Sequence, residues 1–562
     1  MRKLQIFSIL ITVVVFVSHV GAREYVINRD TYHDKLAGGW IGQIVGVTWG
    51  YPTEFAYLGQ MIPEDKVPQW KPEMINDGFG QDDIYVEMTF LKTLEDYGFD
   101  VSIRQAGLDF ANSEYRLWHA NDAGRRNLRD GIAPPDCSHP RFNEHADDID
   151  YQIEADFSGL IAPGIPSYPV EAGEKFGRLV NYGDGMYGGQ WVGAMYSFAF
   201  FEDDVETVVR KGLECIPEGS QYHECISDVL RCYEKDPDNW RKAWDFVEQK
   251  YHKNIDYRQF SCTVQHNFNI DAKLNGAYIA VGLLYGKGDF EDTIKISMMC
   301  GQDSDCNPSN AGGILGVIKG YDNLPDIYKQ IDRERKFEHT AYSFPGLIEV
   351  CEKLAQRLVI RQGGKVVKSD GREKFIIPAG QVRVSKLVQS HKPEPLVGTP
   401  FTQDEMSRIK FNNPEIKEKM PPAFVIGNFA PGWQVLNCGD FMFPGLYDEY
   451  DGRKNVLVTH PYNQVIPCVI TREYSVPQEG GAKLHLIAGH SEKGDYELAV
   501  KVNGRELYNK VVGPETADER YLEAYIDLTD YAGQTIKIDI LNQANGWAFE
   551  AAYWDVIEIV TE

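Results

Sequence analysis

From about residue 31 to residue 360, apolar side chains recur at three- and four-residue spacing, which is the period of amphipathic helices. Ile84, Met88 and Leu91 mark one such segment, and residues 290–298 carry another. Alternation of the kind that marks a β-strand is rare over this range. The pattern therefore predicts an all-α domain over residues 23–360.

The period changes to two in the last quarter of the chain. Apolar and polar residues alternate over 496–502, Asn503-Gly504 supplies a tight hairpin turn, and alternation returns over 536–540. We expect residues 423–562 to form an all-β domain, an antiparallel jelly-roll or sandwich. Residues 361–422 combine short basic strands with proline-rich turns, and we expect them to be a connector wrapped on one of the domains.

Two of the predicted helices carry glycine at every fourth position. The first row is Gly38, Gly42, Gly46 and Gly50, and the second is Gly312, Gly316 and Gly320. Glycine costs a helix about 1 kcal/mol per residue relative to alanine, so such a row needs compensation from close approach of another backbone. We expect both helices to be central and tightly packed.

Composition narrows the class of protein. The chain has 562 residues, 43% of them apolar, and its 83 acidic against 57 basic residues give a net charge of −26. It is globular and too long for one domain. So acidic a surface repels phosphate backbones and anionic lipid, which argues against nucleic acid as a partner.

The first 22 residues read as a signal peptide. Arg2 and Lys3 precede an apolar run over 6–17, and a stretch of small and polar residues ends at Ala22. The run is shorter than the roughly 20 residues that cross a bilayer, and no later segment comes near that length, so we expect no membrane span. The predicted location is secreted or periplasmic.

Ten cysteines are scattered along the chain without a C-x-x-C pair or a Cys/His quartet at zinc spacing. A zinc module is therefore not expected. Export permits disulfides, and Cys215, Cys225 and Cys232 lie close enough along the chain for one or two, but the pairing stays open.

Two acidic motifs stand at predicted helix starts. Asp82 and Asp83 lie in G-Q-D-D-I-Y, and Asp303 and Asp305 lie in G-Q-D-S-D-C-N. Each alone is more typical of a helix cap, but adjacent and alternating carboxylates also suit divalent cations. Glu54 follows the first glycine row, and it is a candidate for catalysis only in combination with these aspartates.

Together these motifs resemble the ADP-ribosylglycohydrolase family, in which a glycine-rich helix ends near a glutamate, a T-D-D-T motif follows, and a G-G-D-T-D-T motif precedes a helix of small residues. The resemblance covers about residues 31–330. It implies an all-helical domain that binds two divalent cations, usually Mg²⁺, and cleaves a glycosidic bond at ribose. By match, the ligands are Asp82, Asp83, Asp303 and Asp305, and Glu54 assists at the reacting centre.

The sequence departs from the family at the threonine ligands. Gln81 and Cys306 stand at two of these positions, and Ile84 stands at a third. A glutamine carbonyl still binds a hard cation, a thiol matches Mg²⁺ poorly, and isoleucine offers no ligand. One ion instead of two, or Ca²⁺ instead of Mg²⁺, fits what remains.

A second departure is the acidic segment 147–156. We expect a helix capped by Asp147, with Asp150 and Glu154 on one face. The segment is either a solvated helix start or the source of a general acid. In the second case Asp148, Asp150 or Glu154 would supply the acidic side chain, and we take Asp148 and Asp150 as the catalytic candidates.

Residues 183–188 match G-x-G-x-x-G, but too few apolar residues precede them for the buried strand of a dinucleotide site. Within the resemblance this turn lines the site, so Asp184, Gly185 and Tyr187 are candidate substrate contacts.

His266 is expected to have a structural role and not a catalytic one. In the β domain, Trp433, Tyr462, Trp547 and Trp554 are available to stack on sugars, although most are expected in the core.

These observations favour a secreted hydrolase that cleaves a ribosyl or other furanosyl-like linkage with divalent-metal assistance. A signal peptide and a sandwich domain suit an extracellular glycan better than an ADP-ribosylated protein, but both substrates stay open. The alternative is a non-catalytic, secreted glycan-binding protein on a decayed glycohydrolase fold.

Overall fold

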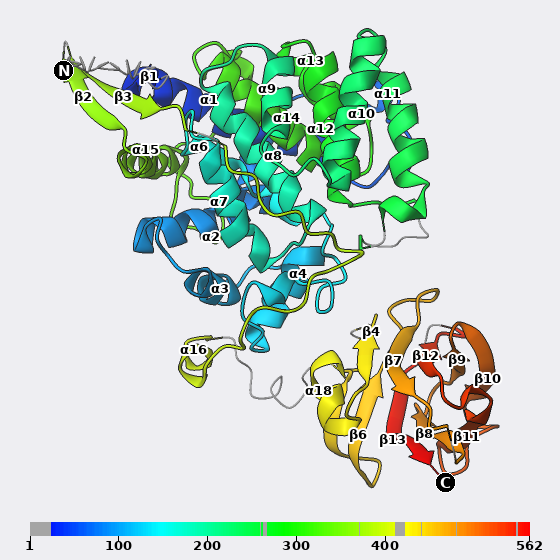
Figure 1. The fold of residues 1–562 in the computed structure, drawn as a ribbon. Helices are drawn as coiled ribbons and strands as arrows, with labels where there is room; N and C mark the ends of the chain where they lie inside the picture. Colours follow the sequence, from blue (N-terminus) through cyan, green and yellow to red (C-terminus); the bar gives the residue numbers. More distant parts are fainter. Residues whose placement is uncertain are drawn as a thin grey trace, which may run out of the picture.

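The structure of the protein is a computed structural model. It describes residues 24–258, 260–261, 267–369, 371–380, 382–410, 422–439, 441–478, 480–546 and 549–561. Figure 1 shows a large helical body followed by a smaller β domain, so the predicted order of an all-α and an all-β domain is confirmed. The predicted signal peptide, His266 and Trp547 lie outside the described residues.

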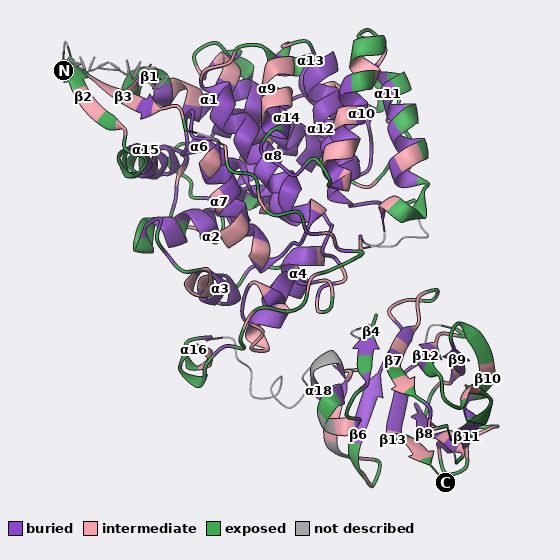
Figure 2. Ribbon diagram, viewed as in Figure 1, coloured by how far each residue is buried: buried purple, intermediate pink, exposed green. Residues whose placement is uncertain are grey.

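The helical body is built around two antiparallel helices, α1 (Arg29–Gly50) and α14 (Cys306–Lys319). Their glycine rows face each other: a Cβ atom at Gly42 would lie 2.1 Å from the Gly312 carbonyl oxygen, and one at Gly316 would lie 2.1 Å from that of Gly38. No side chain fits between backbones this close, which explains the glycines. The prediction of two central, tightly packed helices is confirmed, and both are buried in Figure 2.

Other helices surround this pair. The most buried are α8 (Asp184–Ala199) and α12 (Ala272–Tyr285), which lie in the middle of the body in Figure 2. In contrast, α10 (Gln221–Lys235), α11 (Trp240–Val247) and α15 (Phe344–Arg361) expose one face. The remaining α-helices of the body, in chain order, are α2 (Asp82–Tyr97), α3 (Ile103–Ala111), α4 (His119–Arg129), α5 (Asp150–Ile153), α6 (Asp156–Leu160), α7 (Ser167–Lys175), α8 (Asp184–Ala199), α9 (Val205–Leu213), α10 (Gln221–Lys235), α11 (Trp240–Val247), α12 (Ala272–Tyr285), α13 (Phe290–Met299) and α15 (Phe344–Arg361).

A small sheet joins the start of the body to the segment after α15. Strand β1 (Glu24–Asn28) pairs antiparallel with β3 (Arg372–Pro378), which pairs with β2 (Lys365–Ser369). The connector then runs along the body: Phe401 N donates to Gly131 O at 2.8 Å, and His139 Nε2 lies 2.8 Å from Glu394 O. A short helix, α16 (Gln403–Ser407), follows.

The β domain is a sandwich of two five-stranded antiparallel sheets, entered through α18 (Pro422–Phe429). The inner faces pack Leu484, Val500, Ile538 and Trp554 into one core. One sheet has the order β10-β9-β12-β7-β4 and the other β11-β8-β13-β6-β5. The strands are β4 (Gln434–Leu436), β5 (Gly445–Tyr450), β6 (Arg453–Thr459), β7 (Cys468–Ser475), β8 (Ala482–His490), β9 (Tyr496–Val502), β10 (Arg505–Val512), β11 (Tyr521–Asp527), β12 (Thr535–Gln543) and β13 (Ala552–Thr561).

One expectation needs correction, and one open question of the sequence has an answer. Residues 147–156 are not one solvated helix capped by Asp147: α5 begins at Asp150, Asp147 bonds with Ser390 of the connector at 2.6 Å, and the whole segment is buried. The sequence left open whether Cys215, Cys225 and Cys232 form disulfides, and in the structure all nine described cysteines are free. Among the described residues, no helix combines the length and the apolar character needed to cross a bilayer.

Candidate functional site

The contact between α1 and α14 brings two distant loops together. A Cβ atom at Gly50 would lie 2.1 Å from Ser304 O, and just beyond it Thr53 Oγ1 lies 2.8 Å from Ser304 Oγ. Phe55 N donates to Gln302 O at 3.1 Å. Glu54, between Thr53 and Phe55, is therefore held beside the loop that carries Asp303 and Asp305.

Five carboxylates and one thiol from three segments converge there and form what we term the acid cluster: Glu54, Asp82, Asp83, Asp303, Asp305 and Cys306. One ligand atom from each of Asp303, Asp305 and Cys306 lies within 4.8 Å of the others. Cys306 Sγ donates to Asp83 Oδ2 at 3.3 Å, which joins α14 to the start of α2. Gln81 is buried at the N-cap of α2.

The acid cluster holds more negative charge than the protein compensates. Among the described residues, Oδ1 of Asp83, Asp303 and Asp305 is buried and lacks a hydrogen-bond partner. Burial and the neighbouring carboxylates raise the pKa of Asp83 and Asp305 well above their ordinary range. Burial raises that of Asp303 to about 7. Buried, unpartnered carboxylate oxygens are costly without a cation.

Glu54 differs from the aspartates because its side chain is exposed at the edge of the cluster. Desolvation by the surrounding protein, with the charges of Asp305 and Asp82, raises its pKa to about 8. The carboxyl group therefore keeps a proton near neutral pH and still faces solvent. This combination is typical of a general acid.

A deeper layer of acids is fully satisfied by the protein. Glu87 accepts hydrogen bonds from Gln43 Nε2 at 2.7 Å and from Phe157 N at 2.8 Å. Asp156 accepts from Tyr196 Oη and, at 2.8 Å, from Asn310 Nδ2. These two carboxylates fix α1, α2, α6, α8 and α14 around the site, whereas the acid cluster above them is left open.

The residues present fit a hard divalent cation. Asp82, Asp83, Asp303 and Asp305 offer carboxylate oxygens, and three of the four have a buried oxygen without a partner in the part of the chain that the structure describes. Burial and the surrounding acids raise the pKa of the Cys306 thiol well above its ordinary value. A protonated thiol that donates to Asp83 positions that carboxylate better than it ligates a hard cation.

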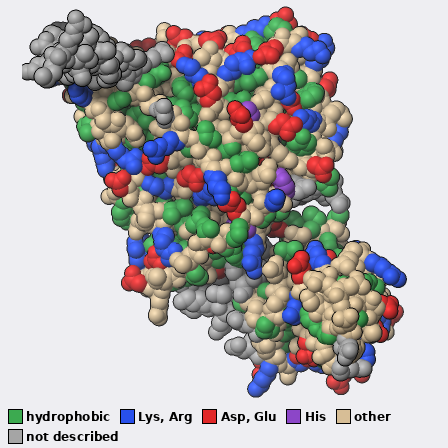
Figure 3. Space-filling view, in the orientation of Figure 1, with side chains coloured by type: hydrophobic (Ala, Val, Ile, Leu, Met, Phe, Trp, Pro, Cys, Tyr) green, Lys and Arg blue, Asp and Glu red, His purple; other side chains and the backbone are tan. Residues whose placement is uncertain are grey.

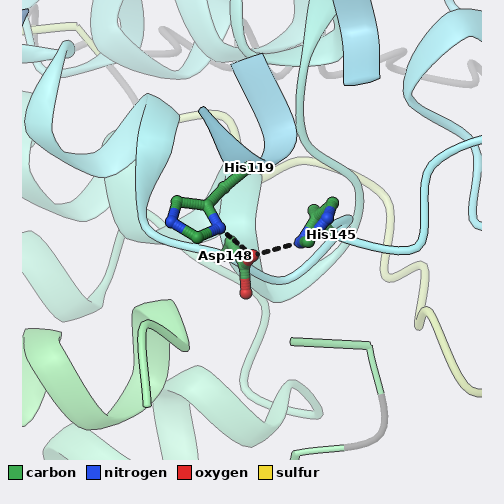
Figure 4. Close-up of side chains that lie close together, drawn as sticks. All are labelled: His119, His145 and Asp148. Atoms are coloured by element: carbon green, nitrogen blue, oxygen red, sulfur yellow. Dashed lines mark hydrogen bonds and ion pairs between the residues drawn. The ribbon is translucent and has the colours of Figure 1, made fainter. Parts of the chain in front are cut away.

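Sequence reasoning missed a second cluster, His119, His145 and Asp148, which we term the histidine cluster. Asp148 Oδ2 lies 2.7 Å from His145 Nδ1 and 3.8 Å from His119 Nδ1 (Figure 4). The His119 ring stacks on Phe268, which packs on Phe55 beside Glu54. The rings thus connect the histidine cluster to the acid cluster.

Of the two catalytic candidates in this segment, Asp148 belongs to the histidine cluster and Asp150 does not. Both oxygens of Asp150 accept main-chain hydrogen bonds at the start of α4, from Ala120 N at 3.3 Å and Asn121 N at 2.9 Å. This geometry favours a positioning role for Asp150 over a catalytic one. Glu154 accepts a hydrogen bond from Asn121 Nδ2 in the same region.

The candidate substrate contacts of α8 already have protein partners. Asp184 accepts from Tyr222 N at 3.1 Å and lies 3.4 Å from the ammonium of Lys273. The Tyr187 hydroxyl donates to Lys386 O at 2.7 Å and accepts from Val388 N at 2.8 Å, both in the connector. At Gly185 a Cβ atom would meet Ala146 O at 2.6 Å. These contacts favour a structural role for the three residues.

In the sandwich, Trp554 and Trp433 are buried, as expected for core residues. Tyr462 instead reaches the helical body, where its hydroxyl lies 3.2 Å from His145 Nε2. It lies in the loop between β6 and β7. The histidine cluster therefore touches both domains, whose bodies are separated by a notch on one side in Figure 3.

Solved structures give distant likenesses. A structure titled "ADP-ribosylglycohydrolase-related protein complex" aligns at 15% identity over 58% of this chain and 97% of its own, with a TM-score of 0.35. TmCBM61 in complex with β-1,4-galactotriose aligns at 16% identity over 25% of this chain and 95% of its own, with a TM-score of 0.19. A cyclase from Fischerella sp. TAU aligns at 13% identity over 23% and 74%, with a TM-score of 0.17.

The search of curated proteins gave no match. The family model of ADP-ribosylglycohydrolase matches residues 28–364, which is more than half of the chain and runs from the start of α1 past the end of α15. This range contains both facing glycine helices and all members of the acid cluster. The chain therefore belongs to the ADP-ribosylglycohydrolase family.

Proposed function

We propose that this protein is a secreted hydrolase that cleaves a glycosidic bond at a ribosyl or other furanosyl-like sugar, with divalent-metal assistance, on an extracellular glycan. The observation that carries the proposal is the acid cluster. Three of its aspartates keep a buried oxygen without a partner among the described residues, beside an exposed Glu54. A decayed site gains nothing from such uncompensated charge.

Asp82, Asp83, Asp303 and Asp305 would hold Mg²⁺ or Ca²⁺. Bound there, the cation supplies charge neutralisation and polarises oxygen atoms of water and sugar. The Cys306 thiol orients Asp83, and Glu87 and Asp156 fix the helices below. Glu54, whose carboxyl group is exposed at the edge of the acid cluster, would act as the general acid that donates a proton to a departing oxygen.

The surroundings of Glu54 favour a sugar as the substrate. Phe55 and Phe268 pack with ring centroids 4.8 Å apart, and the His119 ring lies 5.8 Å from Phe268 in a stacked arrangement. Both phenylalanines are partly exposed beside Glu54. Aromatic faces pack well against the C–H groups of a sugar ring.

The test is product release from the full secreted chain. The enzyme is incubated with pentofuranosyl glycans and with ADP-ribosylated protein, each with Mg²⁺, with Ca²⁺ and with a chelator, and products are identified by mass spectrometry. We expect a released pentose or oligosaccharide that depends on the cation. Free ADP-ribose alone would overturn the glycan proposal, and turnover that persists in the chelator would overturn metal assistance.

The non-catalytic alternative predicts another result. A glycan-binding protein on a decayed fold would retain glycan in a pull-down without releasing product, and substitution of Glu54 would leave that binding unchanged. Wild-type protein, Glu54→Gln and the surface control Glu73→Gln are compared in both assays. Release by wild type and Glu73→Gln, but not by Glu54→Gln, would exclude the alternative.

A further inference from the structure

Two histidines and an aspartate converge on one point outside the motifs that define the family. The ligand atoms offered by His119, His145 and Asp148 all lie within 4.8 Å of one another. Figure 4 shows the two rings on either side of the Asp148 carboxylate. We propose that His119, His145 and Asp148 bind a divalent first-row transition-metal cation such as Zn²⁺, separately from the acid cluster.

The distances are close to those that a tetrahedral site requires. Zinc–ligand bonds of about 2.0–2.1 Å place neighbouring ligand atoms about 3.3 Å apart. Asp148 Oδ2 is 2.7 Å from His145 Nδ1 and 3.8 Å from His119 Nδ1, so one pair has to open and the other to close by about half an ångström. A cation bound there would replace the contact between His145 Nδ1 and Asp148 Oδ2.

The donor set selects a different metal from the acid cluster. Imidazole nitrogens suit Zn²⁺ and its neighbours, whereas four carboxylates suit Mg²⁺ or Ca²⁺. Each of the two rings offers an imidazole nitrogen within 4.8 Å of an oxygen of Asp148. Two histidines and one carboxylate leave a coordination position for water or a substrate atom.

The segments that carry the ligands are fixed to one another. Asn143 Oδ1 accepts from His145 N at 2.9 Å, and Asn143 Nδ2 donates to Ala120 O at 3.3 Å. Asp150 holds the N-terminus of α4 through Ala120 and Asn121. His119 begins α4 with a φ of 45°, an uncommon conformation that these contacts maintain. The site is therefore organised before a metal arrives.

The sandwich contributes the outer partner of one ligand. Tyr462 Oη lies 3.2 Å from His145 Nε2, the ring nitrogen that faces away from Asp148. Metal-binding histidines typically bond an oxygen through their second nitrogen, and loss of that partner weakens metal affinity about 10–100-fold. Metal binding and docking of the sandwich loop should therefore support each other.

The experiment measures binding and needs no substrate, so its outcome is independent of the proposed hydrolysis. Chelator-stripped full-length protein is titrated with Zn²⁺, and with Co²⁺ as a spectroscopic probe. We expect one Zn²⁺ that persists in Asp303→Asn and is at least about 100-fold weaker in His119→Ala and in Asp148→Asn. The visible absorption of bound Co²⁺ should disappear in the same variants.

His33→Ala serves as the matched control. His33 pairs with Glu352 near the N-terminus of α1, whereas Glu54 follows the C-terminus of that helix, so the substitution should leave the zinc affinity unchanged. Cooperative thermal unfolding at the wild-type temperature verifies that each variant folds. Loss of zinc binding in Asp303→Asn, together with unchanged zinc binding in His119→Ala, would overturn the proposal, since the ion would then belong to the acid cluster. Full zinc affinity in both Asp148→Asn and His119→Ala would equally overturn it.

A second pair of variants tests the contribution of the sandwich. Tyr462→Phe removes one hydroxyl, and affinity should fall about 10–100-fold without a change in the fold. Tyr525→Phe removes a comparable hydroxyl that bonds to Glu523 on the sandwich surface, and it should bind zinc as the wild type does. Equal affinity in all three proteins would overturn the role of Tyr462.

Discussion

Gly46 of α1 lies directly against the main-chain carbonyl of Pro308 in α14, so that a Cβ atom at Gly46 would stand 2.1 Å from that oxygen. The end of a flexible side chain could move aside for such a Cβ atom, but a main-chain carbonyl within a helix cannot. The same contact continues to Gly50 and Ser304, and from there the chain leads to Glu54 on one side and Asp305 on the other. The glycine rows therefore set the distance between Glu54 and the candidate metal ligand Asp305.

The first prediction concerns this packing. Gly46→Ala should lower the free energy of unfolding of the helical body by about 3 kcal/mol, because α1 and α14 have to move apart. Gly346→Ala is the control: in α15 the nearest atom to its Cβ is Ser343 Oγ at 3.5 Å, and it should be neutral or stabilising by up to about 1 kcal/mol. Denaturant unfolding measures both. Similar values for the two variants would contradict the packing argument.

The second prediction concerns Glu54. Glu54→Gln removes the proton donor without changing size, so kcat should fall by about 10²–10⁴-fold while the melting temperature is unchanged. Steady-state kinetics on the glycan found in the product-release assay provide the measurement, with Glu73→Gln as the exposed control. A change in KM alone would assign Glu54 to binding.

The third prediction concerns the cation. Mg²⁺ or Ca²⁺ at about 100 times its Kd should stabilise the wild type by about 2.7 kcal/mol, because the ion binds the folded state. Asp303→Asn should abolish this shift and leave the metal-free protein as stable as the wild type or more so, since one buried charge is gone. Thermal unfolding with each cation and with a chelator measures it.

The control for that experiment is Asp326→Asn, whose side chain is fully exposed and pairs loosely with Lys329. It should retain the whole metal-dependent shift. An equal shift in wild type and Asp303→Asn would show that the cation binds elsewhere.

The fourth prediction concerns pH and the connector. Arg104 forms hydrogen bonds to Glu405 of α16 and lowers the pKa of that carboxyl group to about 2. Because the folded value is below the unfolded one, near 4.5, the stabilisation is present above pH 4.5 and is lost as the pH falls towards 2. Limited proteolysis of the connector across this range should show the loss.

Arg104→Gln removes the partner and should make connector proteolysis independent of pH between 4.5 and 2. The variant should also be cut faster than wild type at neutral pH. Unchanged pH dependence in Arg104→Gln would show that another acidic group controls the connector.

The glycine rows and the acidic motifs carried most of what the sequence could predict. Glycine at every fourth position has a single physical explanation, close backbone contact, and the structure pairs the two rows. The order of a helical and a β domain follows from the change of period from about 3.6 to two. These signals are local or strictly periodic, which is why sequence alone carries them.

The histidine cluster was missed because its geometry is not local. His119 and His145 come from segments 26 residues apart along the chain, and no spacing rule joins them. Tyr462 comes from the other domain altogether. The segment 147–156 was expected to be either a solvated helix start, because its acids are typical of a surface, or the source of a general acid. Those acids are instead buried and engaged by α4, His145 and the connector.

The pairing of β1 with β3 has a consequence for protein engineering. It places the entry to the helical body and its exit after α15 on adjacent strands of one small sheet. A unit whose two ends lie side by side tolerates circular permutation and insertion into another host far better than one whose ends are far apart. We therefore expect that the helical body can be inserted into another protein, provided that the sheet of β1, β2 and β3 is kept intact.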